Sequence, residues 1–94
     1  MSLPPSEYTK LKAFRDLIAK TVDRLGQAQS QGTLAQAAND SAASWDGVDG
    51  DFAGVLRGVA NNVWQGSFAQ VRPTVQAIIG HLQGQLKDID AQLR

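Results

Sequence analysis

The sequence predicts an all-α fold: an antiparallel helical hairpin that pairs into a four-helix bundle. Apolar residues recur at helical spacings of three and four through both halves of the chain, and no stretch shows the alternation of a half-buried strand. The middle of the chain, residues 44–51, is rich in Asp and Gly, as a turn would be. The 94 residues form a single domain, too short to bury a large core alone.

The first helix is predicted over residues 6–43. The segment Pro4-Pro5-Ser6 is a start signal, because the Ser6 hydroxyl can accept a hydrogen bond from a free helix amide. Gly26 and Gly32 weaken the helix, so we expect a kink, fray or short break between residues 27 and 33. The expected buried face contains Tyr8, Leu11, Phe14, Ile18, Val22, Leu25 and Ala28.

The turn is predicted over residues 44–51. Trp45 is expected to cover one end of the helix-pair core, only partly buried, with its indole N–H bonded to a group of the turn. Gly47 and Gly50 permit left-handed backbone angles, so the chain can end one helix and reverse. Asp49 or Asp51 can then cap the second helix.

The second helix is predicted over residues 51–93, with a bend near Pro73, because proline removes a backbone donor and crowds the preceding turn. Trp64 is expected in the core, paired with Phe68 four residues on, beside an incidental Gly66. In the alternative, a new helix begins after Trp64-Gln65-Gly66 and places Pro73 past its first turn. The continuous apolar series favours the single bent helix.

Nine residues are expected to form the core or an interface: Phe14, Ile18, Leu25, Phe52, Leu56, Trp64, Phe68, Ile78 and Leu82. The apolar stripes to which they belong are broader than one seam between two helices can bury. We therefore expect two hairpins to dimerise and to bury the remainder between them.

Composition excludes several classes of function. Nine basic residues balance nine acidic ones, so the chain lacks the positive excess of a nucleic-acid-binding protein. It has no cysteine for a disulfide, a thiolate metal site or a nucleophile. No apolar stretch approaches the ~18–20 residues of a membrane span, and no signal-peptide core is present. We expect a cytoplasmic protein, or one secreted without a cleaved signal peptide.

Neither an enzyme nor a cofactor or metal site is predicted. The aspartates of the turn fail as an EF-hand loop, because the twelfth position counted from Asp49 is Ala60 rather than glutamate. His81 is the single histidine, and the further ligands that a zinc site requires do not accompany it. The serines have no base nearby, and the cations Arg57 and Arg72 stand apart from one another.

The motif Trp45-Asp46-Gly47, followed by the aromatic Phe52, in a helical chain of this length resembles the WXG superfamily of early-secreted-antigen-like proteins. Its members are substrates and partners of type VII secretion. The resemblance implies that Trp45 and Gly47 form the turn and that hairpins pair as homodimers or heterodimers. It also implies export without a cleaved signal. The family's Tyr-x-x-x-Asp/Glu export signal does not occur here, which fits a member that travels with its partner.

Two functions follow from the sequence. The first is a dimeric helical interaction protein of type VII secretion, acting as a substrate or as the partner of a larger effector. The alternative is a cytoplasmic helical adaptor, immunity or chaperone-like protein that binds a larger partner. Both depend on burying apolar helix faces in a partner, so the sequence leaves the choice open.

Overall fold

The computed structural model describes residues 4–93, which contain four helices and no strand. The helices are α1 (Pro5–Gln27), α2 (Gln31–Trp45), α3 (Gly50–Gln65) and α4 (Phe68–Leu93). The predicted all-α class is confirmed. Each of the two predicted helices, over 6–43 and 51–93, is interrupted once. The first break, at residues 28–30, lies in the stretch 27–33 where a kink, fray or short break was predicted. The second covers residues 66–67, so the prediction of one continuous helix over 51–93 is wrong.

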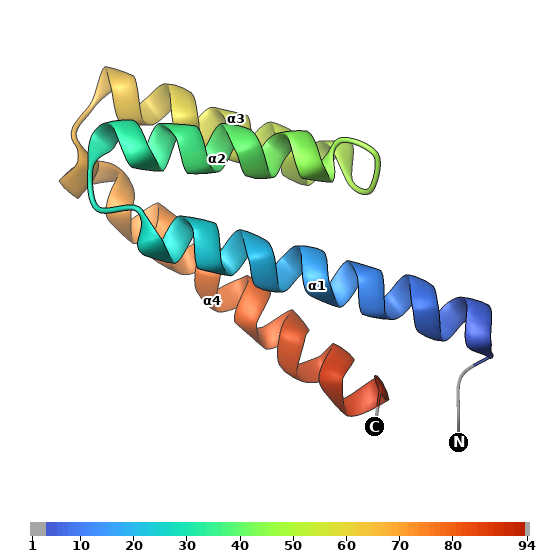
Figure 1. Cartoon of the computed structure of the whole chain (residues 1–94). Coiled ribbons are helices and arrows are strands. Elements are labelled where there is room, and N and C mark those ends of the chain that lie inside the picture. The colour runs from blue at the N-terminus through green and yellow to red at the C-terminus, as the bar shows by residue number, and fades with distance from the viewer. Residues whose placement is uncertain (1–3, 94) are drawn as a thin grey trace.

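Both breaks lie at the same end of the molecule, so the chain folds back on itself (Figure 1). The antiparallel pair α2–α3, here termed the tip layer, lies over the pair α1–α4, termed the terminal layer. The closest packing is within each layer, while α1 also contacts α2 and α3 touches α4 sparsely. The longest dimension is 48 Å, shorter than the roughly 60 Å of an unbroken forty-residue helix.

The first break follows from local capping chemistry. The backbone of Ala28 is extended, with φ −69° and ψ 123°, and ends α1. Ser30 then starts α2 through a capping box with Thr33. Its Oγ accepts from the Thr33 backbone N–H at 3.3 Å, and Thr33 Oγ1 accepts from the Ser30 N–H at 3.0 Å. Two amides that a new helix would leave free are thereby satisfied.

The second break lies at Gly66 rather than near Pro73, the position at which the bend was predicted. Gly66 caps α3 by donating its N–H to the Asn62 carbonyl at 2.9 Å. A Cβ at this position would lie 2.7 Å from Gln70 Oε1, so a larger residue here would displace the end of the exposed Gln70 side chain. Pro73 instead lies inside α4 past its first turn, as the alternative stated. The carbonyl that it leaves without a helical donor belongs to Ala69, a solvent-exposed residue.

The reversal predicted between Ser44 and Asp51 is present. Trp45 ends α2, and its carbonyl accepts from the N–H groups of Val48 and Asp49 at 2.9 and 2.8 Å. The Asp49 carboxylate caps α3 by accepting from the Phe52 N–H at 3.1 Å, which confirms one of the two predicted caps.

Two details of the predicted helix ends are wrong. None of the glycines of the turn, nor any other described residue, has a positive φ. The chain leaves α2 through right-handed angles at Asp46, φ −54° and ψ −37°, so no left-handed residue is needed. Ser6 lies inside α1, which begins at Pro5 after the N-cap residue Pro4 without a side-chain cap. A proline at the first position lacks the N–H that a cap would satisfy.

Replacing the cap of α2 tests the origin of the first break. Ser30→Ala removes the hydroxyl that accepts from Thr33 and should lower the free energy of unfolding by about 1 kcal/mol. Ser6→Ala is the matched control, because its hydroxyl caps no helix in this structure. Urea unfolding followed by circular dichroism measures both. Equal losses in the two variants would contradict the role given to Ser30.

Candidate interaction surface

Trp45, the last residue of α2, lies between the two layers. Its side chain is only 2% exposed, and its indole N–H donates to Oγ1 of Thr21 in α1 at 2.8 Å. Its ring meets Phe14 of α1 and Phe52 of α3 edge-on, with centroid separations of 5.6 and 4.6 Å. The prediction of a partly buried turn aromatic is therefore wrong. The fold-back lays α1 over the end of α2, and Trp45 joins the two layers.

Thr21 is a partner of Trp45 that the sequence reading missed. It is fully buried, and its hydroxyl donates to the Leu17 carbonyl at 2.9 Å while accepting from the indole. Both hydrogen-bonding functions of this buried hydroxyl are thus satisfied. Its position in the sequence could have indicated this role, because Thr21 is a polar residue between Ile18 and Leu25 on the buried face of α1.

Trp64 lies on the surface, although the sequence placed it in the core. Its side chain is 63% exposed, the largest fraction among the exposed large apolar side chains of the described residues. The predicted pair with Phe68 does not form within one helix, because α3 ends at Gln65 and Phe68 begins α4. The indole instead lies beside Gly32, where an added Cβ would be 4.0 Å from its ring.

The other expected core and turn residues fall into three groups. Ile18, Leu25, Leu56 and Leu82 are buried. Phe14, Phe52, Phe68 and Ile78 are partly buried and pack against the core. Gly47 lies in the turn and Gly50 begins α3, and both are exposed.

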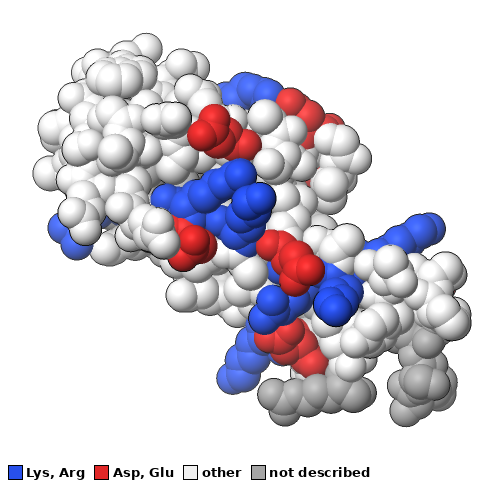
Figure 2. Space-filling view, viewed as in Figure 1, with Lys and Arg blue, Asp and Glu red and all other residues white. Residues whose placement is uncertain are grey.

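The end of the molecule that carries both breaks is almost free of charge. Residues 25–39 and 58–71 contain no Asp, Glu, Lys or Arg. In Figure 2 this end is almost entirely white, while basic and acidic side chains alternate in a band across the middle. Residues 25–39 and 58–71 are termed the break end here, and they include the exposed Trp64. An exposed tryptophan in an uncharged surface is typical of a protein contact site.

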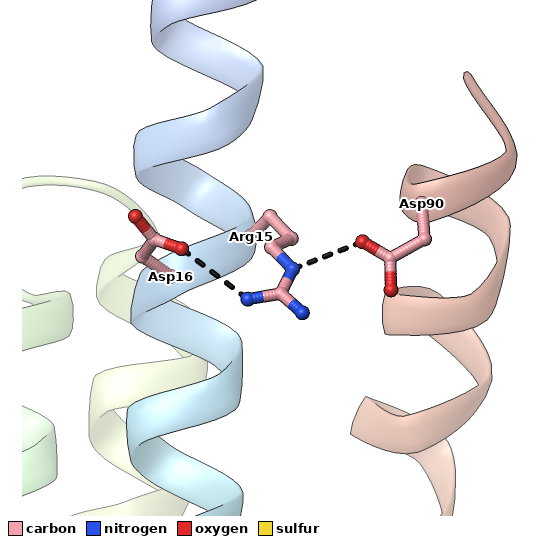
Figure 3. Close-up of polar contacts among 3 residues, drawn as sticks. All are labelled: Arg15, Asp16 and Asp90. Atoms are coloured by element: carbon pink, nitrogen blue, oxygen red, sulfur yellow. Dashed lines mark hydrogen bonds and ion pairs between the residues drawn. The ribbon is translucent and has the colours of Figure 1, made fainter. Parts of the chain in front are cut away.

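Ion pairs hold the helices together within each layer. Arg15 Nε of α1 donates to Asp90 of α4 at 2.9 Å, and its Nη1 lies 3.4 Å from Asp16 (Figure 3). The hydrogen bond with Asp90 is the main cause that raises the pKa of Arg15. In the tip layer Arg57 donates two hydrogen bonds to Asp46, at 2.7 and 2.5 Å. Arg57, which looked isolated in the sequence, thereby lowers the pKa of Asp46.

Contacts between the layers carry no ion pair within the described residues. Besides the bond between Trp45 and Thr21, Arg24 Nη1 of α1 donates to Ser44 Oγ of α2 at 3.3 Å. No three His, Asp or Glu side chains of residues 4–93 gather where they could hold a metal ion. None of the helices α1–α4 has the length and hydropathy to cross a membrane.

The two tryptophans should differ sharply on substitution. Trp45→Ala removes a buried ring and should cost about 3–5 kcal/mol, a large share of the roughly 5–15 kcal/mol by which typical domains are stable. Trp64→Ala makes the same chemical change on the surface and should alter stability by no more than about 0.5 kcal/mol. Circular dichroism melts of both variants measure the difference. A larger loss for Trp64→Ala would contradict the burial described here.

The ion pair of Asp46 and Arg57 should make the free energy of unfolding depend on pH. A carboxyl whose pKa is lowered on folding stabilises the protein above its ordinary pKa of about 3.9 and loses this effect as the pH falls through the folded-state pKa. Arg57→Gln should therefore melt below the native protein at pH 5–7, and the gap should close below about pH 4. Lys87→Gln, at an exposed cation outside the ion pairs of the described residues, controls for loss of a surface cation. A gap that stays constant down to pH 2 would count against this ion pair.

Comparisons with protein-family models, curated proteins and solved structures gave no match for this chain. The resemblance to the WXG superfamily therefore stays a prediction from Trp45-Asp46-Gly47 and the helical pattern.

Proposed function

We propose that this chain is a helical interaction protein whose two layers separate at the breaks and receive a second helical hairpin. The second hairpin is a copy of the same chain or a similar one. The observation that carries the proposal is the pairing of the helices: α1 packs on α4 and α2 packs on α3. An extended hairpin would contain the same two pairs. Straightening both breaks therefore keeps the contacts within each layer and releases those between layers.

The two breaks are placed to act as one hinge. They contain two or three residues each and no proline. The Gln31 side chain connects them by donating to the carbonyls of Val63 and Gly66, the latter at 3.3 Å. Hinges of this kind concentrate a large change of backbone angles in a few residues at the ends of helices.

A second copy would replace each contact that separation releases. The surface between the layers is mainly apolar, and the side-chain hydrogen bonds across it are those of Trp45 to Thr21 and of Arg24 to Ser44. A second chain presents the same residues, so the exchanged dimer regains these contacts without a new interface. The low stability expected of a small single chain lowers the free energy needed to open it.

The break end adds a surface for the partner. Trp64 is exposed there in a region without charged side chains. Tryptophan often contributes much of the binding energy at protein interfaces. In this proposal Trp64 contributes to partner binding rather than to the stability of the chain.

A role in type VII secretion, as substrate, co-substrate or partner of a larger effector, is the finer form of this proposal. It rests on the resemblance carried by Trp45-Asp46-Gly47. The adaptor, immunity or chaperone-like alternative would use the same opening to take up a larger partner. In both forms the protein acts by binding rather than by catalysis. A neighbouring gene for an FtsK-like ATPase or a second WXG protein favours secretion, and a toxin gene alone favours the alternative.

Cross-linking between introduced cysteines tests the exchange of layers. The described chain has no cysteine of its own. Arg24→Cys with Ser44→Cys places one thiol in each layer, at side chains that touch in the structure. In an exchanged dimer α1 of one copy contacts α2 of the other. A short bismaleimide reagent should therefore give covalent dimers on a denaturing gel, in a proportion that rises with the dimer fraction in sedimentation.

The matched control pair is Asp46→Cys with Arg57→Cys, which lies within the tip layer. It should give cross-linked monomers only, because this layer stays intact in both forms. Covalent dimers from the control pair would show association through another surface. A protein that sediments as a monomer at all concentrations, with monomeric products from both pairs, would overturn the proposal.

A further inference from the structure

A pocket of about 510 Å³ lies at the break end, where α1, α2 and α4 meet. Its apolar walls include Leu25 of α1, Leu34 of α2 and three side chains of α4, namely Phe68, Val75 and Ile79. Sites for small ligands typically measure about 300–1,000 Å³ and combine apolar walls with a few polar groups. Both layers contribute to the walls, so the pocket belongs to the folded-back chain.

Arg72 is the one charged residue among those that line the pocket. The ion pairs of the described residues involve Arg15 and Arg57, and none involves Arg72. The sequence also supplies no acid nearby along the chain, because residues 52–87 contain no Asp or Glu and residues 25–39 contain no charged residue. The pocket therefore combines an uncompensated positive charge with apolar walls.

The remaining polar groups are the side-chain amides of Gln29 and Gln76. Like Arg72, both residues are solvent-exposed, and their amides can donate hydrogen bonds to a ligand in the pocket. A single guanidinium with two amides suits one carboxylate, which it can bind through two parallel hydrogen bonds. A polyphosphate would need several cations, and an organic cation would be repelled by Arg72.

We propose that this pocket binds a small apolar carboxylate, an unbranched alkanoate of medium chain length. The carboxylate meets Arg72, and the alkyl chain lies against Leu25, Phe68 and Ile79. This site does not rest on the proposed exchange of layers, because a permanently closed monomer would contain it as well. Recognition requires both the charge and the apolar chain.

Calorimetric titration with octanoate tests the site, with 1-octanol and octylamine as probes of matched chain length. Octanoate should bind the native protein at one site. The alcohol should bind at least about tenfold more weakly, since it lacks the charge-assisted hydrogen bonds, and the amine should not bind. Arg72→Gln should weaken octanoate about tenfold or more and leave octanol unchanged. Lys87→Gln, which removes an exposed cation of α4 outside the pocket, should leave octanoate binding unaltered.

Filling the pocket provides a second, independent variant. Gly26 lines the pocket, and a Cβ added there meets nothing within 4 Å, so Gly26→Phe should occupy the site and abolish octanoate binding. Gly54→Phe is the matched control, because Gly54 also has open space around it and lies outside the pocket. Circular dichroism establishes that each variant is folded.

Three kinds of result would overturn the proposal. The first is the absence of saturable octanoate binding to the native protein. The second is equal affinity for octanoate and octanol, or unchanged octanoate binding by Arg72→Gln, which would remove the role of the charge. The third is equal octanoate binding by the folded Gly26→Phe and Gly54→Phe variants, which would place the ligand elsewhere.

Discussion

The folded-back arrangement depends on the hydrogen bond between the Trp45 indole and the Thr21 hydroxyl. Both residues are out of contact with water, at 2% and 0% exposure, and they belong to different layers. An apolar contact between two helices tolerates sliding, whereas a buried donor left without its acceptor costs about 1–3 kcal/mol. This bond therefore sets where α2 lies along α1, and the rings of Phe14 and Phe52 pack around the position that it determines.

Among the described residues, the ion pairs lie within the two layers and not between them. The ion pair of Arg15 and Asp90 joins α1 to α4, and the ion pair of Asp46 and Arg57 lies within the tip layer. The surface between the layers is mainly apolar. An apolar surface can be offered equally well by a second copy. The balance between a closed chain and an exchanged one then lies largely with the breaks. The capping box of Ser30 and the cap at Gly66 favour the closed form, because straightening the chain sacrifices both.

Helical periodicity and turn chemistry were enough to predict the all-α class, the reversal after Trp45 and the cap at Asp49. They did not predict the fold-back, although Gly26 and Gly32 indicated a weak helix. In one continuous helix Trp64 and Phe68 would share a face. The break at residues 66–67 ends that register, so α3 buries Val63 and leaves Trp64 outside. The burial of Trp45 depends on Thr21, twenty-four residues away, a contact that no local pattern contains.

The pocket at the break end connects ligand binding to the state of the layers. Leu25 belongs to the terminal layer and Leu34 to the tip layer, so separating the layers divides the pocket wall. A ligand that binds only the closed chain stabilises it by about 2.7 kcal/mol at one hundred times its dissociation constant. That free energy would add to the energy required for opening. In these two proposals the surface around Trp64 and the pocket beside Arg72 bear on one equilibrium: a protein partner favours separated layers, and an alkanoate favours the folded-back chain, in which the break residues Ala28 and Gln29 line the pocket.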